Sequence, residues 1–144
     1  MEIEFSLTKL IVADVNLLER FYVALGFKVT ERRFGKDVTG TGDVAQEQSR
    51  LSTTGEKIPP QLVLSRFINF PEPTVPGPAY PGPYWLVFRT PNVAASIEAA
   101  VGAGGWVARP AADVTDPRHP FRAGIVCDPE GNFIELYGPK NAAA

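Results

Sequence analysis

Near the end of the chain, in "AGIVCDPEGNFIELYGP", the carboxylate of Glu135 is set among the apolar residues of a predicted strand. A buried, unpaired carboxylate is strongly unfavourable, so this residue needs a partner or a function. Four roles are open. Glu135 can form an internal ion pair with Arg89, Lys9 or Arg122, contact a ligand, act as a general base, or bind a metal ion.

Two further residues could move protons together with Glu135 if the protein is an enzyme. Tyr137 lies two positions after it, and His119 lies in the proline-bounded loop "DPRHPF". An ordinary histidine pKa of about 6.5 suits an acid or a base at a cavity mouth. The alternative for His119 is a loop residue that faces solvent. The chain has only one histidine, which excludes a site built from several imidazoles.

The single cysteine, Cys127, is predicted to be a small core residue rather than a nucleophile. It alternates with Val126, and we expect it on the helix-packed side of its strand. The segments "RAGIVCD" and "NFIELYG" around it predict a hairpin whose turn is "PEGN".

Two segments that could position these side chains share one pattern. In the first, a strand in "FSLTKLIVAD" ends at Asp14, a predicted helix N-cap, and Gly26 is predicted to end the helix. In the second, the strand in "YWLVFRTP" leads to Asn92 and then to Gly104. The spacing between the equivalent residues is 78 in both cases. The first helix carries an apolar stripe of Leu18, Phe21, Tyr22 and Leu25.

The remaining strand patterns complete a βαβββ order that occurs twice, which predicts an α+β fold. We expect a single domain over residues 1–144, with modules at 1–67 and 85–140. Between them, 68–84 is predicted to be a proline-rich linker, because its six prolines oppose helix formation and strand pairing.

Two of these motifs resemble the vicinal oxygen chelate superfamily of glyoxalases, extradiol dioxygenases, fosfomycin-resistance enzymes and bleomycin-binding proteins. They are "LIVADVNLLERFYVALGFKV" at the start and "DPEGNFIELYGP" at the end. The resemblance implies a glyoxalase-like fold, in which two βαβββ modules form a cupped, barrel-like cavity. Many members dimerise, so a homodimer is expected.

In metal-dependent relatives, the ligands come from the first and last strands of each module. The corresponding positions here are Leu7, Val63, Trp85 and Glu135. Leucine and valine have no donor atoms for a metal, and the indole of tryptophan only donates hydrogen bonds. A single carboxylate would hold a divalent ion weakly. The sequence therefore departs from the metal-dependent pattern, and we expect neither a metal nor another cofactor.

Alternate residues of a strand face the same side, so neighbours of these positions are predicted to line the cavity. Arg122 is assigned to this face together with Gly124 and Val126, and Gln46 and Gln48 share a face that could reach it. Aromatic, charged and hydroxyl groups in one cavity suit an organic ligand of moderate size. The predicted ligand-binding residues are Leu7, Lys9, Gln61, Val63, Trp85, Arg89, Arg122, Phe133, Glu135 and Tyr137.

The function that these observations favour is metal-independent binding of an aromatic or natural-product ligand, for resistance or sequestration. One alternative is a metal-independent lyase, isomerase or cyclase with Glu135 as general base, and a second is a glyoxalase- or dioxygenase-type metalloenzyme. A net charge of −2 without a basic run argues against a nucleic-acid partner. The absence of a long apolar run and of a signal-peptide pattern argues against a membrane and predicts a cytoplasmic location.

Overall fold

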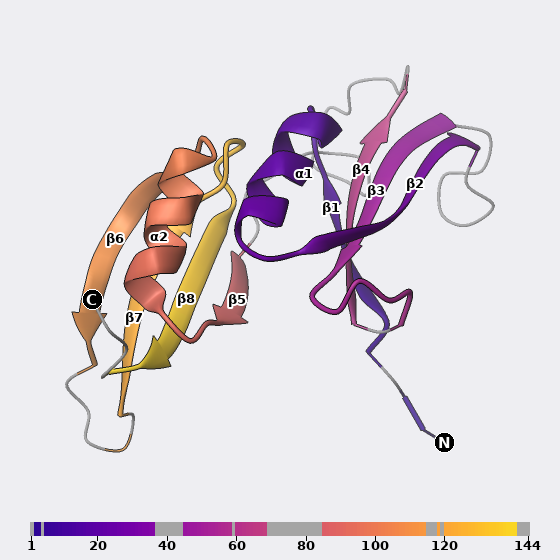
Figure 1. The fold of residues 1–144 in the computed structure, drawn as a ribbon. Coiled ribbons are helices and arrows are strands. Elements are labelled where there is room, and N and C mark those ends of the chain that lie inside the picture. The colour runs from indigo at the N-terminus through magenta and orange to yellow at the C-terminus, as the bar shows by residue number, and fades with distance from the viewer. Residues whose placement is uncertain are drawn as a thin grey trace. The chain divides into compact units, whose positions relative to one another are not determined.

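The computed structural model describes residues 2–3, 5–36, 45–58, 60–68, 85–114, 118 and 120–140. The chain divides into two compact units, Met1–Gly82 (unit 1) and Pro83–Ala144 (unit 2). Within the described residues, each unit contains one helix and one four-stranded sheet (Figure 1). The linker predicted at 68–84 lies outside the described residues apart from Ile68, and so does His119.

Unit 1 has the element order βαβββ. Its elements are β1 (Leu7–Ile11), α1 (Val15–Ala24), β2 (Lys28–Lys36), β3 (Ala45–Ser52) and β4 (Gln61–Phe67). In space the strands follow the order β1–β4–β3–β2. The β1–β4 pair is parallel and the other pairs are antiparallel. The long connection that a parallel pair requires is provided by the segment containing α1, β2 and β3.

Unit 2 repeats this arrangement. Its elements are β5 (Trp85–Arg89), α2 (Val93–Gly102), β6 (Trp106–Asp113), β7 (Phe121–Cys127) and β8 (Phe133–Pro139), in the spatial order β5–β8–β7–β6. The predicted α+β fold with two βαβββ modules is therefore confirmed. Pro110 interrupts the register of β6 with β7, and it is tolerated because β6 is an edge strand.

The predicted helix ends are also confirmed. The side chains of Asp14 and Asn92 each accept the N–H of the residue three positions later, both at 3.0 Å. Gly26 and Gly104 follow the two helices with φ of 111° and 96°. Glycine adopts this conformation without the steric cost that a Cβ would add.

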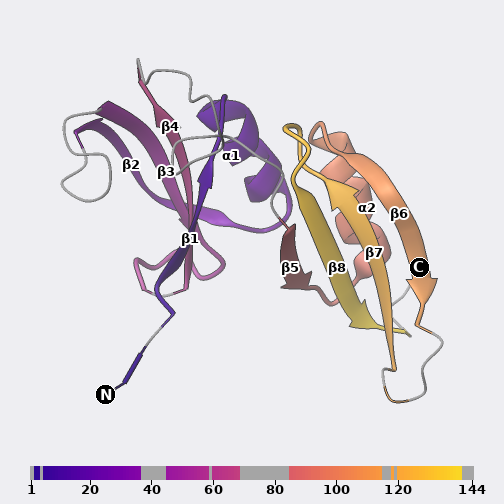
Figure 2. The same cartoon turned by 180° about the vertical axis from the view of Figure 1, so that it is seen from behind.

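Each helix covers one face of the sheet in its own unit (Figures 1 and 2). Three residues of the predicted stripe on α1, Leu18, Phe21 and Tyr22, are fully buried, whereas Leu25 at the helix end is half-buried. Burial of such a side chain contributes roughly 1.5–3 kcal/mol. The core of unit 2 lies between α2 and its sheet, where the buried side chains include Val93, Ala100, Val126, Ile134 and Leu136.

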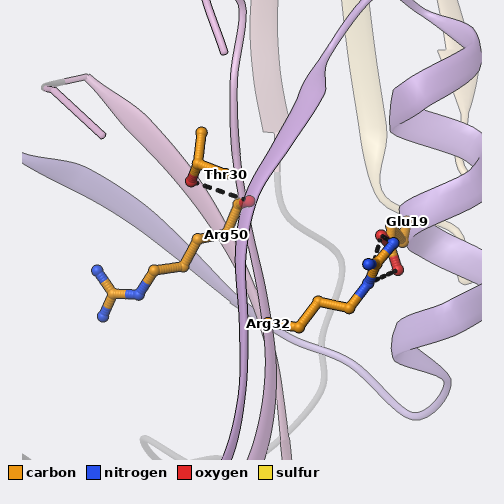
Figure 3. Close-up of polar contacts among 4 residues, drawn as sticks. All are labelled: Glu19, Thr30, Arg32 and Arg50. Carbon is orange, nitrogen blue, oxygen red and sulfur yellow. Dashed lines mark hydrogen bonds and ion pairs between the residues drawn. The ribbon is translucent and has the colours of Figure 1, made fainter. Parts of the chain in front are cut away.

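A polar contact also ties α1 to its sheet. Glu19 on α1 is 7% exposed. Its carboxylate accepts a hydrogen bond from Nε of Arg32 on β2 that is shared between its two oxygens, at 3.0 and 3.3 Å, and another from Nη2 (Figure 3). The hydrogen bond to Glu19, followed by the attraction of its charge, raises the pKa of the Arg32 guanidinium. This pair satisfies a carboxylate that the sequence places on the buried side of the helix.

Both sheets are open, with β1 and β2 at the edges of one and β5 and β6 at the edges of the other. The described residues therefore contain no closed barrel. In the same part of the chain, no helix is long and apolar enough to cross a membrane.

Candidate ligand-binding site

The sheet of unit 2 has one face under α2 and one open face. Ile134 and Leu136 of β8 are buried under the helix, so the residues that alternate with them face the other side. Directly opposite one another lie Trp85 and Phe133, Val87 and Glu135, and Arg89 and Tyr137. The prediction that Trp85, Arg89, Phe133, Glu135 and Tyr137 share a face is confirmed, while their contact with a ligand stays a prediction.

A pocket of about 430 Å³ opens on this face. Its lining includes Trp85 from β5, Glu135 from β8, Ile125 from β7 and Arg109 from β6. These residues bring an aromatic ring, a carboxylate, an aliphatic surface and a guanidinium to one hollow. The volume lies in the range of about 300–1,000 Å³ that is typical of sites for small organic molecules.

Two aromatic pairs flank Glu135 on the open face. The ring centroids of Trp85 and Phe133 lie 5.2 Å apart with planes tilted by 32°. The rings of Phe121 and Tyr137 meet edge to face at 5.5 Å. Trp85 remains 55% exposed, which is unusual for so large an aromatic residue and leaves its ring available for stacking.

Glu135 itself is half-buried, and no hydrogen bond or ion pair reaches its carboxylate from the residues that the structure describes. Arg89, one of its three expected partners, shares the open face but is exposed and forms no ion pair with it. Lys9 belongs to unit 1. Arg109 lines the same pocket and also makes no ion pair within the described chain.

Arg122, the third expected partner, lies on the other side of the sheet. Strand β7 pairs with β8 through Ala123 opposite Tyr137 and Ile125 opposite Glu135, which turns Arg122 away from the open face. Arg122 instead forms an ion pair with Asp113, in which Nη1 of Arg122 lies 3.4 Å from Oδ1 of Asp113. Assigning Arg122, and with it Gly124 and Val126, to the face of Glu135 was therefore wrong.

The cause of this error is the turn between β7 and β8. A four-residue turn "PEGN" would pair Asp128 with Phe133, but Cys127 pairs with Phe133 instead. Asp128 leaves the strand, and its carboxylate accepts the backbone N–H groups of Glu130 at 2.9 Å and Asn132 at 3.0 Å. The longer turn shifts the pairing by one residue, and such a shift exchanges the two faces of a strand.

The same shift moves Cys127 to the open side of the sheet, so its predicted place on the helix-packed side was also wrong. Cys127 is nevertheless only 3% exposed. Burial, and to a smaller degree the charge of Asp128, raises the pKa of its thiol. A buried, protonated thiol is a poor nucleophile, so the prediction of a small core residue agrees with this environment.

The open face of unit 1 is more polar. The pairs Leu7–Gln61 and Lys9–Val63 point to one side, as predicted for these four residues. Three buried polar residues occupy the same face, and they bond to one another. Nε2 of Gln48 donates to Oε1 of Gln46 at 3.0 Å, and Oγ of Ser65 donates to the same oxygen at 2.6 Å.

This cluster is larger than the sequence indicated. The alternation of Gln46, Gln48 and Arg50 along β3 was a visible signal for a polar face. The contribution of Ser65 required the register between β3 and β4, which places it opposite Gln48.

Of the four positions that correspond to metal ligands in metal-dependent relatives, only Glu135 carries a group suited to a metal. The described residues contain no group of three or more His, Cys, Asp or Glu that could hold an ion. The chemistry of Leu7, Val63 and Trp85 therefore does not fit a metal centre at this place.

Comparison at the sequence level finds no matching family model and no matching curated protein. Several solved structures are similar in fold. A glyoxalase family protein from Bacillus cereus superposes with a TM-score of 0.69 and 18% identity, over 96% of this chain and 93% of that one.

Two further structures are similar. TioX from Micromonospora sp. ML1 has a TM-score of 0.62 and 20% identity, over 94% of this chain and 98% of TioX. A mutant of glyoxalase I from Zea mays has a TM-score of 0.67 and 20% identity over 92% of this chain, which matches 46% of the maize protein. At these identities the likeness establishes the fold. The chain thus has a glyoxalase-like fold, as the resemblance of its two terminal motifs had implied.

Proposed function

We propose that this protein binds a small organic ligand with a planar aromatic ring on the open face of unit 2, without a metal ion. The observation that carries the proposal is a half-buried carboxylate, Glu135, which lacks a partner in the described chain and lies beside the exposed Trp85 ring. A ligand that supplies both a ring and a hydrogen-bond donor or a positive charge would satisfy both residues.

The ring of such a ligand would stack on Trp85. Aromatic pairs contribute about 0.5–1.5 kcal/mol beyond the burial of their surface. Phe133 packs beside Trp85 and limits the orientations of the indole, which reduces the entropy lost when a ligand stacks on it.

The donor or charge of the ligand would meet Glu135. A hydrogen bond to an ionised group contributes about 1.5–3 kcal/mol, more than a neutral one, when the group is shielded from water. Arg109 on the opposite wall of the pocket would accommodate an acceptor at the other end of the ligand. Capture of this kind without turnover fits sequestration, including protection from an antibiotic natural product.

The test is a screen of aromatic natural products and 2-oxo compounds by thermal shift, each with and without Ni²⁺, Zn²⁺ or Mn²⁺. A specific ligand raises the melting temperature with dose, because binding stabilises the folded state by RT ln(1 + [L]/Kd). Binding is then measured by quenching of Trp85 fluorescence in a Trp106→Phe background, which leaves one tryptophan as reporter.

Three variants make the test specific. Trp85→Ala should lose the ring contact, and Glu135→Gln should weaken a donor-bearing ligand by about tenfold or more. Glu98→Gln removes the same charge from the exposed surface of α2 and should bind normally. If Glu135→Gln and Glu98→Gln bind equally well, the proposed role of Glu135 is wrong.

Glu135 also keeps the second candidate function open, because an unpaired carboxylate in a pocket is placed to take a proton from a bound molecule. Turnover of a bound compound that is lost in Glu135→Gln would favour a metal-independent lyase, isomerase or cyclase over capture. Stabilisation by a metal ion that disappears in Glu135→Ala would instead favour a metalloenzyme.

A further inference from the structure

Arg50 occupies a central position on the open face of unit 1. It lies in β3, opposite Val63 of β4 and Glu31 of β2. Cross-strand partners point to the same side of a sheet, so these three side chains share the open face. Figure 3 shows Arg50 extending away from the side on which Arg32 reaches α1. Val63, which lies beside Arg50, is fully buried.

The guanidinium of Arg50 contains a hydrogen-bond donor that has no acceptor. Its Nε is buried, and it has no hydrogen-bond partner. A guanidinium only donates hydrogen bonds, and a buried donor without an acceptor is unfavourable. Oγ of Ser49 is also buried and unpaired, but Ser49 lies opposite Leu64 and so faces the helix side. Arg50 is thus the unsatisfied buried donor of the open face among the described residues.

Glu31, the acid opposite Arg50, is engaged elsewhere. Its carboxylate lies 2.9 Å from Nε of Arg33 and 3.8 Å from Nζ of Lys57. The hydrogen bond from Arg33 outweighs the opposing effect of burial and holds the pKa of Glu31 below its ordinary value, and the charges of Lys57 and Arg50 add to this. Glu31 is therefore held by Arg33 and Lys57, and its carboxylate forms no ion pair with Arg50.

The polar neighbours of Arg50 do not supply the missing acceptor. Gln48, two positions earlier on the same face, donates from Nε2 to Gln46 at 3.0 Å and lies 3.5 Å from Oγ of Ser65. Ser65 in turn donates to Gln46. This buried network fixes the side chains next to Arg50, and none of these three bonds reaches the guanidinium.

We propose that Arg50 binds the carboxylate of a small organic acid on the open face of unit 1. A planar carboxylate matches the two parallel N–H bonds that a guanidinium offers, and such charge-assisted pairs are stronger than neutral ones. The fully buried Val63 opposite Arg50 excludes water from one side of the guanidinium. The site depends only on residues of unit 1, and it stands independently of the aromatic site of unit 2.

The direct test uses the Nε–Hε signal of Arg50 in ¹H–¹⁵N NMR spectra of the full chain, assigned by its absence in Arg50→Lys. Benzoate is titrated at constant ionic strength, with benzamide as a neutral analogue of the same shape and inorganic phosphate as a tetrahedral anion. Benzoate should shift this signal saturably, and benzamide should not. Phosphate should bind more weakly than benzoate because its shape does not match the planar fork.

Variants identify the residue by a thermal-shift titration with benzoate. Arg50→Gln should lose the stabilisation, whereas Arg20→Gln, which removes the same charge from the exposed surface of α1, should keep it. Arg50→Lys retains the charge without the fork and should bind about tenfold more weakly. The free Arg50→Gln protein should melt no lower than wild type, because its loss removes an unpaired buried donor.

Four results would overturn the proposal. The first is a signal shift that sodium chloride reproduces, because that indicates only screening of charge. The others are an equal response to benzamide, tighter binding of phosphate than of benzoate, and undiminished binding of benzoate by Arg50→Gln. Amines and neutral aromatic compounds probe unit 2 instead, so a failure at Arg50 leaves the function proposed for Trp85 and Glu135 separately testable.

Discussion

The side-chain amide of Asn132 donates a hydrogen bond to Asp128 at 2.7 Å, across the turn that leads into the strand of Glu135. Asp128 is fully buried and accepts two further bonds from backbone N–H groups of the turn. The segment "DPEGN" is thus a hydrogen-bonded clasp that sets the pairing of β7 with β8 and thereby which residues of β7 share the face of Glu135.

Asp128→Ala should strongly destabilise the protein. The change removes the acceptor of three hydrogen bonds at a buried site, and bonds to a charged group contribute about 1.5–3 kcal/mol each, although not additively. We expect a loss on the order of 3 kcal/mol in the free energy of unfolding, measured with urea. Asp113→Ala, which removes a largely exposed acid from the same unit, should cost less than about 1 kcal/mol. Similar losses in the two variants would contradict the clasp.

Gly138→Ala should also be disruptive, for a steric reason. A Cβ at this position would lie 2.0 Å from the carbonyl oxygen of Thr90, which is backbone and cannot easily move aside. Overpacking of this kind costs about 1–3 kcal/mol or more. Gly102→Ala is the matched control, because a Cβ there meets nothing within 4 Å and alanine favours the helix. Thermal unfolding of both variants tests the contrast, and an unchanged Gly138→Ala protein would show that the close approach is wrong.

Removal of Arg32 should destabilise unit 1, because it leaves the carboxylate of Glu19 without its cationic partner. Arg32→Met leaves the carboxylate of Glu19 at a position that is 7% exposed, without the cation that compensates it. A buried charge that loses its partner is more costly than the loss of the whole pair. The double variant Glu19→Gln/Arg32→Met should therefore be more stable than Arg32→Met alone. Urea unfolding of the wild type, Glu19→Gln, Arg32→Met and the double variant completes the cycle, and additive losses would argue against coupling.

The thiol of Cys127 should react slowly in the native protein. Burial raises its pKa and keeps it protonated, so alkylation by iodoacetamide should proceed only as the protein opens and should be complete in urea. The folded pKa lies above the ordinary value of 9.0, so the folded state binds this proton more tightly than the unfolded state. The corresponding stability is present below pH 9.0 and declines as the pH rises above it.

Cys127→Ala should show a weaker loss of stability over the same alkaline range, even if its stability at neutral pH is lower because of the smaller side chain. Rapid labelling of the native wild-type thiol would contradict this account. Equal pH dependence of wild type and variant would show that other groups cause the alkaline decline.

Much of the fold followed from local rules. Asp14 and Asn92 cap helices because their side chains reach the free N–H groups of the next turn, and that geometry is encoded within a few residues. The shared face of Trp85 and Glu135 was expected from the resemblance to metal-dependent relatives, and alternation then added their neighbours Arg89, Phe133 and Tyr137. Alternation within one strand needs no knowledge of its partner.

Pairing between strands was harder to predict. The sides of the sheet on which Arg122 and Cys127 lie depend on the number of residues in the turn between β7 and β8. The buried hydrogen bonds of Asp128 make this turn one residue longer than expected. The partner of a charged side chain depends on which strands lie side by side, so the sequence could name Arg122 for Glu135 while the register placed it against Asp113.

The amino-acid sequence by itself determined the two βαβββ modules, their helix ends and the departure of Leu7, Val63 and Trp85 from a metal-binding pattern, because side-chain chemistry and short-range geometry suffice for these. Only the tertiary structure decided which polar groups remain unsatisfied. Glu135 and Arg50 are candidate binding groups because the charged residues near them pair with other partners. Those partners depend on the register of each sheet, which results from packing and pairing over the whole of each unit.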